Sequence, residues 1–195
     1  MAEYFARGEW GYAFHPRFGV LFQTLSGTAV RLFGLSGECA SQIVSIGLYS
    51  LAAVPLWFVV RALFDSRTAW WALALTLLSD DLTRNAFDGL RDSGKCLGFA
   101  LVALGVVRRE SKWYALGLFV LVTLTSYCFA LALILLVGWC LFANSGEPAS
   151  TRLKGALLPV CAFVLAGALV TLLTHSFTGH WLPSTHYIKL LGRWL

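Results

Sequence analysis

Long apolar runs alternate with short charged stretches along most of this chain. The clearest run is Ile43–Val60, "IVSIGLYSLAAVPLWFVV", and shorter ones follow at Trp70–Leu82, Cys96–Val107 and Leu157–Thr174. A helix that crosses a bilayer needs about 20 apolar residues, and a helix packed inside a bundle can be shorter. The pattern therefore predicts an all-α fold, a polytopic bundle of transmembrane helices.

The longest run, Trp113–Ala143, contains no charged residue and is too long for one comfortable crossing. Basic residues fill the three connections around it: Arg61 and Arg67; Arg108, Arg109 and Lys112; Arg152 and Lys154. Lys and Arg favour cytoplasmic loops, and these connections share one side only if Trp113–Ala143 crosses twice, breaking near Thr123–Cys128. This gives about six spans. Aromatic residues that directly follow basic loops are expected to anchor at the interface: Trp70, Trp71, Trp113 and Tyr114.

The N-terminal stretch Arg17–Phe33 is apolar but interrupted by polar residues, so an amphipathic interfacial helix fits better than a seventh span. If this stretch does span, the N-terminus moves to the inner side. The expected organisation is a single transmembrane domain, 1–195. An outer juxtamembrane segment (1–37), an outer charged loop (79–95) and an outer tail (175–195) belong to it. The spacing Gly94-x-x-x-Gly98 also allows helices to pack closely.

The composition agrees with a membrane location. Of the 195 residues, 58% are hydrophobic and only 13% are charged, whereas about a quarter are charged in a soluble domain. The net charge of +5 is explained by the basic loops, so we expect no nucleic-acid partner. The five cysteines form no C-x-x-C and are expected to be small buried hydrophobes, not a disulfide framework or a zinc site.

The stretch Ser79–Cys96, "SDDLTRNAFDGLRDSGKC", gathers four aspartates, two arginines and a lysine in a chain with ten acidic residues. One interpretation is an ordinary solvated loop. The other is a site, because Arg91, Asp92 and Lys95 touch the start of the next apolar helix, where lone charges are costly unless paired or functional. An acid among basic groups can hold a phosphate or act as a base beside one.

Other chemistry has little support. His175, His180 and His186 do not have zinc-ligand spacing, and the chain contains no P-loop, G-x-S-x-G or H-E-x-x-H motif. A soluble-type hydrolase or nucleotidase is therefore not indicated. A small transporter would need ionisable groups within its spans, which carry almost none.

Four stretches, in this order, resemble the GT-C membrane glycosyltransferases. The nearest branches are the dolichyl-phosphate-mannose protein mannosyltransferases and the bacterial lipid A aminoarabinose transferases. Residues 1–45 resemble the outer segment of the family, with its His-Pro and its interfacial helix that ends in Phe-Gly. "VPLWFVVRALFDSRTAWWALALTLLS" is similar to the inner hairpin, "RNAFDGLRDSGKCLGFAL" to the second outer loop, and "SFTGHWLPSTHY" to the outer exit of a later span.

This resemblance implies transfer of a sugar from a polyprenyl-phosphate carrier to a lipid or protein acceptor. The reaction would take place on the outer face of a membrane, expected here to be a bacterial inner membrane. Asp92 best matches the acid of the second outer loop, with Asp88 in reserve. The resemblance makes Arg84, Arg91 and Lys95 the partners of the carrier phosphate, and it places His15 in the site lining. Some branches use a divalent metal, which the resemblance leaves open here.

The resemblance implies that the chain is truncated at both ends, since the family's first span and its C-terminal half have no counterpart here. The principal catalytic acid of the family lies in the first outer loop, before the matching segment, and neither Glu3 nor Glu9 takes its place. An outer N-terminus without a signal sequence also suggests a missing upstream span. We therefore expect that Met1 is internal to a longer frame and that this stretch alone lacks full catalytic competence. A non-catalytic scaffold or remnant is the main alternative.

Overall fold

The computed structural model places helices along most of the chain. It describes residues 2–9, 20–80, 83–84, 92–124, 128–142 and 149–178. The helices in these ranges are α1 (Ala2–Ala6), α3 (Val20–Phe33), α4 (Gly37–Leu63), α5 (Ser66–Leu77), α7 (Asp92–Arg108), α8 (Ser111–Leu124), α9 (Phe129–Phe142) and α10 (Ala149–Thr178). These described residues contain no strand, and the all-α prediction is confirmed.

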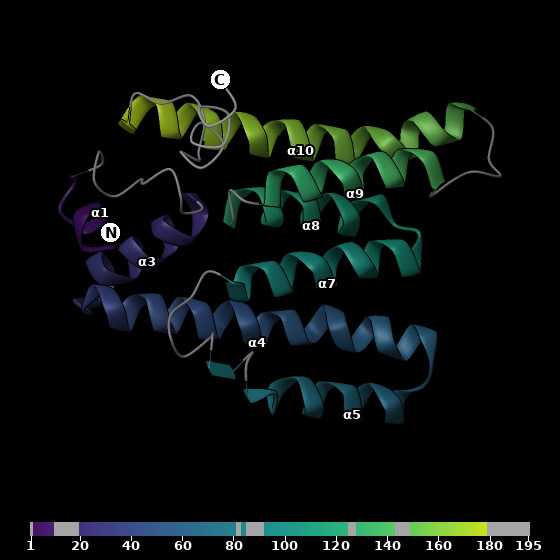
Figure 1. Cartoon of the computed structure of the whole chain (residues 1–195), viewed down its shortest axis with the longest axis horizontal. Helices are drawn as coiled ribbons and strands as arrows, with labels where there is room; N and C mark the ends of the chain where they lie inside the picture. Colours follow the sequence, from purple (N-terminus) through teal and green to yellow (C-terminus); the bar gives the residue numbers. More distant parts are fainter. Residues whose placement is uncertain are drawn as a thin grey trace, which may run out of the picture.

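The helices from α4 onward lie side by side, with α5 at one edge and α10 at the other (Figure 1). Helix α7 packs between α4 and α8, and α10 packs against both α8 and α9. Helices α1 and α3 lie together at the end of the bundle where α4 begins (Figure 1). The chain therefore runs back and forth between two ends.

Side chains that cap the first turn set where α4 and α5 begin. The Ser36 hydroxyl accepts the Cys39 N–H at 3.2 Å before α4, and the Asp65 carboxylate accepts the Thr68 N–H at 2.6 Å before α5. Side chains that accept such bonds satisfy backbone donors that the first turn leaves open. Because of the Asp65 cap, α5 starts at Ser66, four residues before the predicted run. The helix ends at Leu77, whereas the predicted run extends to Leu82.

The turn from α7 to α8 is tight and unusual. Arg109 has a φ of 54°, its N–H donates to Val106 O at 3.2 Å, and the next N–H, of Glu110, donates to Gly105 O at 3.0 Å. This pair of bonds is a Schellman motif, in which glycine normally takes the left-handed position. The turn brings α8 straight back along α7.

The long uncharged run breaks where the loop charges predicted. Helix α8 ends at Leu124 and α9 begins at Phe129. The prediction that Trp113–Ala143 forms two helices with a break near Thr123–Cys128 is therefore confirmed.

Small residues allow α7 and α8 to approach closely. A Cβ atom at Gly94 would lie 2.8 Å from Leu124 Cδ1, and one at Gly98 would lie 2.6 Å from Leu121 Cγ. The contact continues at Gly117, where a Cβ would lie 2.6 Å from the backbone nitrogen of Val102. The predicted packing through Gly94-x-x-x-Gly98 is confirmed, and the glycine contact extends further along both helices.

A proline inside α10 is matched by a tryptophan from α9. Pro159 lacks an N–H, so it cannot bond the carbonyl of Gly155 one turn earlier. The indole N–H of Trp139 donates to that carbonyl oxygen at 3.2 Å. Tyr114 of α8 stacks on Trp139, with 4.3 Å between ring centroids, and is only 2% exposed. The prediction that Tyr114 is an interface anchor is thus wrong, because its ring belongs to the α8–α9–α10 core.

The outward faces of the helices are apolar. On α9, Ile134 is 67% exposed and Phe142 is 74% exposed; on α10, Leu165 is 63% exposed. Within the part of the chain that the structure describes, two helical segments, Gly37–Leu63 and Leu153–Ser176, are long and apolar enough to cross a membrane, and only 28% and 22% of their most apolar stretches are buried. The remaining helices are shorter, with 12 residues in α5, 17 in α7 and 14 each in α8 and α9.

The cysteines are only partly as predicted. None of the five forms a disulfide, and Cys128 is buried. Cys140 and Cys161 are exposed, so the prediction of buried cysteines is wrong for these two. The reason is that α9 and α10 are apolar on all sides, and an apolar sequence therefore does not tell which face turns inward.

Candidate functional site at the capped end of the bundle

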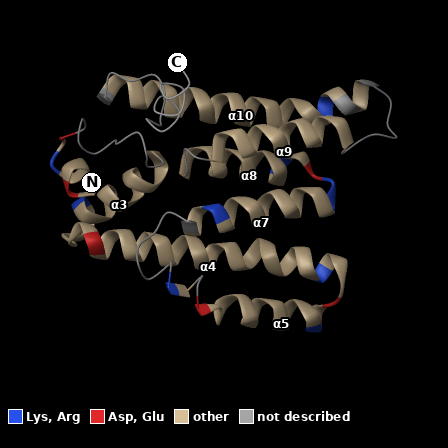
Figure 2. Cartoon of the chain, viewed as in Figure 1, with Lys and Arg blue, Asp and Glu red and all other residues tan. Residues whose placement is uncertain are grey.

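Charged residues gather at the two ends of the helix bundle (Figure 2). The capped end is the one covered by α1 and α3, where α4 and α7 begin and α8 and α10 end. The basic end is formed by residues 61–67, 108–112 and the start of α10, and it carries Arg61, Arg67, Arg108, Arg109, Lys112 and Lys154. The predicted site residues that the structure describes all lie toward the capped end.

The cap is fixed to the bundle by specific contacts. The Glu3 carboxylate of α1 accepts the backbone N–H of Gly37, at the start of α4, at 3.2 Å. A Cβ atom at Gly27 of α3 would lie 2.3 Å from Cδ1 of Phe5, so α1 rests directly on the α3 backbone. Helix α3 in turn contacts α4, α8 and α10. The cap therefore closes over several helix ends at once.

The interior beneath the cap is polar. Among the described residues, six polar side chains are buried, and all lie in the part of their helix nearest this end: Gln23, Ser26, Ser45, Ser93, Thr123 and Thr174. The hydroxyls of Ser45 on α4 and Ser93 on α7 are hydrogen-bonded at 2.8 Å. The Thr123 hydroxyl donates a hydrogen bond to the Phe119 carbonyl oxygen of its own helix at 2.7 Å. Polar groups are costly to bury, so their concentration here distinguishes this end from the apolar middle of the bundle.

Ser26 adds an open hydrogen-bonding group to this interior. It is 1% exposed, and its hydroxyl has no hydrogen-bond partner among the described residues. A buried hydroxyl in this situation calls for a partner, such as water or a bound polar molecule. The polar interior thus includes a group suited to contact something other than the described protein.

The charged stretch reaches this interior through α7. Asp92 is the first residue of that helix, Ser93 is buried next to it, and Lys95 is half-buried in the same first turn. Asp80 and Arg84 are exposed after α5, and the Thr83 hydroxyl between them donates to Leu77 O at 2.9 Å. Three other predicted site residues lie outside the described residues: His15, Asp88 and Arg91.

Sequence reasoning missed the buried partners of this stretch. Ser45 lies in the middle of the run "IVSIGLYS", and Gln23 and Ser26 lie in the run taken as interfacial. A lone polar residue in an apolar run indicates a contact between helices, because at membrane depth its side chain needs a hydrogen-bond partner on another helix. The identity of that partner depends on helix register, which the run itself does not contain.

Two carboxylates of the described residues have perturbed pKa values, and both lie at the basic end, outside the candidate site. The N–H of Thr68 holds the pKa of Asp65 below its usual range. The ion pair with the Lys112 ammonium, at 2.8 Å, holds the pKa of Glu110 below its usual range. Their charges therefore persist to lower pH than usual.

Within the described ranges, no three His, Cys, Asp or Glu residues come together as a metal-binding group. No protein-family model, curated protein or solved structure matches this chain. The function is therefore argued from the site and its surroundings.

Proposed function

We propose that this chain is a multi-pass membrane protein with its capped end on the outer face. The spans would be α4, α5, α7, α8, α9 and α10, with α3 lying in the interface. Two observations support this topology. The outward faces of α9 and α10 are apolar, and the basic end collects the Lys and Arg residues that favour the cytoplasmic side.

The chemistry proposed for the capped end is transfer of a sugar from a polyprenyl-phosphate carrier to a lipid or protein acceptor, in the manner of the GT-C glycosyltransferases. One observation carries this proposal. The first turn of α7 carries Asp92, Ser93 and Lys95, and the buried Ser93 hydroxyl is hydrogen-bonded to that of Ser45 at 2.8 Å. An acidic and a basic residue thus belong to the same helix turn as a buried polar pair, a combination that suits binding a phosphate and accepting a proton from an attacking hydroxyl.

Donor binding tests the site directly. Lys95→Gln removes the ammonium proposed to hold the carrier phosphate. It should weaken binding of polyprenyl-phosphate mannose or polyprenyl-phosphate aminoarabinose to the purified chain about tenfold, since a hydrogen bond to a charged group is lost. Arg31→Gln, an exposed cation of α3 at the same end, is the matched control and should change binding little. Equal losses in both variants, or no binding by the wild type, would overturn the proposal.

The role of Asp92 is tested by transfer in membranes that contain the chain. Loss of a general base lowers the rate by about a hundredfold or more, so Asp92→Asn should abolish most transfer while leaving donor binding intact. Asp80→Asn, an exposed aspartate at the same end, should transfer normally. A wild-type chain that binds donor without transferring sugar would support the non-catalytic alternative.

A further inference from the structure

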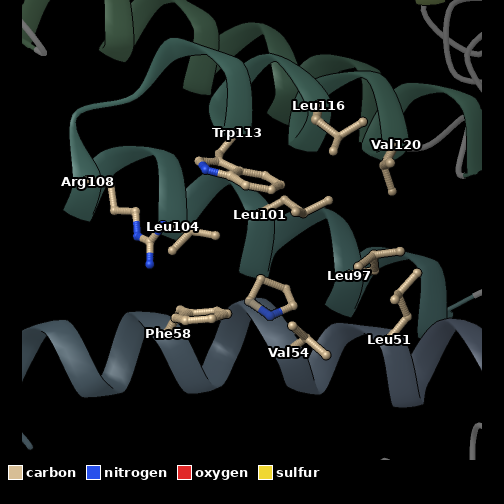
Figure 3. Close-up of a pocket in the computed structure, with 11 residues that line it drawn as sticks. Leu51, Val54, Phe58, Leu97, Leu101, Leu104, Arg108, Trp113, Leu116 and Val120 are labelled. Atoms are coloured by element: carbon tan, nitrogen blue, oxygen red, sulfur yellow. The ribbon is translucent and has the colours of Figure 1, made fainter.

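A groove runs along the outside of α4, α7 and α8 (Figure 3). It has a volume of about 460 Å³. Except for one arginine, its lining is apolar: Leu51, Val54, Pro55, Phe58, Leu97, Leu101, Leu104, Arg108, Trp113, Leu116 and Val120. The groove is thus built from three helices that already pack together.

The shape of the groove fits a slender chain. Its lining on α7 extends from Leu97 to Arg108 at helical spacing, which corresponds to a length of about 16 Å along the helix axis. A long, apolar groove with a single cation at one end suits a hydrocarbon chain that carries an anionic head.

One end of the groove is cationic. The Arg108 guanidinium lies 4.9 Å from the centroid of the Phe58 ring and stands at the groove end in Figure 3. Within the described ranges, Glu110 forms its ion pair with Lys112 at 2.8 Å, and Arg108 acts on Glu110 only as a nearby charge. The arginine stem can lie on the apolar wall while the guanidinium offers planar donors to a phosphate.

We propose that this groove binds one acyl chain of an anionic glycerophospholipid, with the lipid phosphate at Arg108. The inference goes beyond sugar transfer and depends only on contact between the chain and membrane lipid, not on the number of spans. The phosphate positions of the two sites are separate, because Arg108 and Lys95 lie about 20 Å apart along α7. On the proposed topology the bound lipid belongs to the inner leaflet, whereas the sugar carrier would act at the outer face.

Native mass spectrometry of the purified chain with phosphatidylglycerol and phosphatidylcholine of identical acyl chains tests the proposal. Selective retention of phosphatidylglycerol is expected. Arg108→Gln should reduce that retention about tenfold, by loss of a charge-assisted bond. Arg61→Gln is the matched control, because Arg61 also stacks on an aromatic ring at this end, 5.0 Å from Trp57, but does not line the groove. Equal retention of both lipids, or equal effects of both variants, would overturn the proposal.

A second pair of variants tests the acyl chain. Val54 lines the groove and is 53% exposed, so Val54→Trp should fill the space without disturbing the core and should reduce phosphatidylglycerol binding. Val164→Trp changes a similarly exposed residue of α10, 59% exposed and outside the groove, and should leave binding unchanged. Unaltered binding in Val54→Trp would contradict the proposal.

Two further outcomes separate this inference from the proposed function. If polyprenyl phosphate displaces phosphatidylglycerol from the wild type, the groove belongs to the carrier, and the phospholipid proposal is wrong. If alkaline carbonate releases the chain from membranes while selective phosphatidylglycerol binding persists, the spanning topology fails and the groove proposal stands.

Discussion

At the scale of single residues, Arg109 is the one non-glycine residue of the described backbone with a positive φ. Its φ of 54° places it in the left-handed region, where a residue with a Cβ is disfavoured by about 1 kcal/mol or more. The helix ends at Gly8 and Gly34 use the same backbone region, but with glycine, at φ values of 78° and 64°. The turn between α7 and α8 therefore stores backbone strain that the other two helix ends avoid.

Arg109→Gly should accordingly raise the free energy of unfolding by about 1 kcal/mol. Arg61→Gly, inside the last turn of α4, is the control and should lower it by up to about 1 kcal/mol, because glycine is a poor helix former. Thermal and denaturant unfolding in detergent would measure both changes. A loss of stability in Arg109→Gly would show that the arginine side chain contributes more than the strain costs.

The Asp65 cap makes stability depend on acid pH. Because the folded-state pKa of Asp65 is lowered by the Thr68 N–H, the stability that its charge contributes is complete above its ordinary value near 3.9. It is lost as the pH falls through the lowered pKa. Asp65→Asn can still cap the helix but does not titrate, so its unfolding temperature should fall less between neutral pH and about pH 2. Identical acid profiles for both proteins would contradict this prediction.

At the scale of helices, Trp139 links α9 to α10 at the turn of α10 that Pro159 leaves without a backbone hydrogen bond. Pro159 leaves the Gly155 carbonyl without its helical donor, and the Trp139 indole supplies one at 3.2 Å. Polar contacts between helices contribute about 1 kcal/mol within membranes. The sequence position of the proline therefore determines where α9 must place its tryptophan.

A double-mutant cycle tests this relation. Trp139→Phe should destabilise the wild type by about 1 kcal/mol and should have a smaller effect in a Pro159→Ala background, where residue 159 bonds Gly155 itself. The difference in unfolding free energy measures the coupling. If Trp139→Phe has the same effect in both backgrounds, Trp139 contributes only through its packing.

The sequence predicted these helices better than it predicted their partners. Apolar runs and loop charges were enough for the break between α8 and α9, because both are local features. They gave the wrong start for α5, which is set by the Asp65 side chain, and the wrong role for Tyr114, which is set by Trp139 on another helix. The same holds for the candidate site: local charge was enough to propose Asp92 and Lys95, but not to predict that Ser93, between them, bonds the buried Ser45.

At the scale of the whole molecule, Lys and Arg residues gather at the basic end, and this predicts that the basic end faces the cytoplasm. In a cysteine-free background, Asp80→Cys at the capped end should react with a membrane-impermeant maleimide in intact cells. Ser66→Cys at the basic end should react only after the cells are opened. Both positions are exposed, so accessibility within the protein does not limit the comparison. The opposite labelling pattern would invert the proposed topology.

The unequal helix lengths have a consequence for the surrounding lipid. Helix α5, at one edge, has 12 residues, and α10, at the other edge, has 30, which correspond to lengths of about 18 Å and 45 Å. A hydrocarbon core of about 30 Å would have to thin beside the first helix, while the second would tilt or project. Hydrophobic mismatch of this kind favours some membranes over others, so bilayer thickness itself would affect where this molecule resides and how it tilts there.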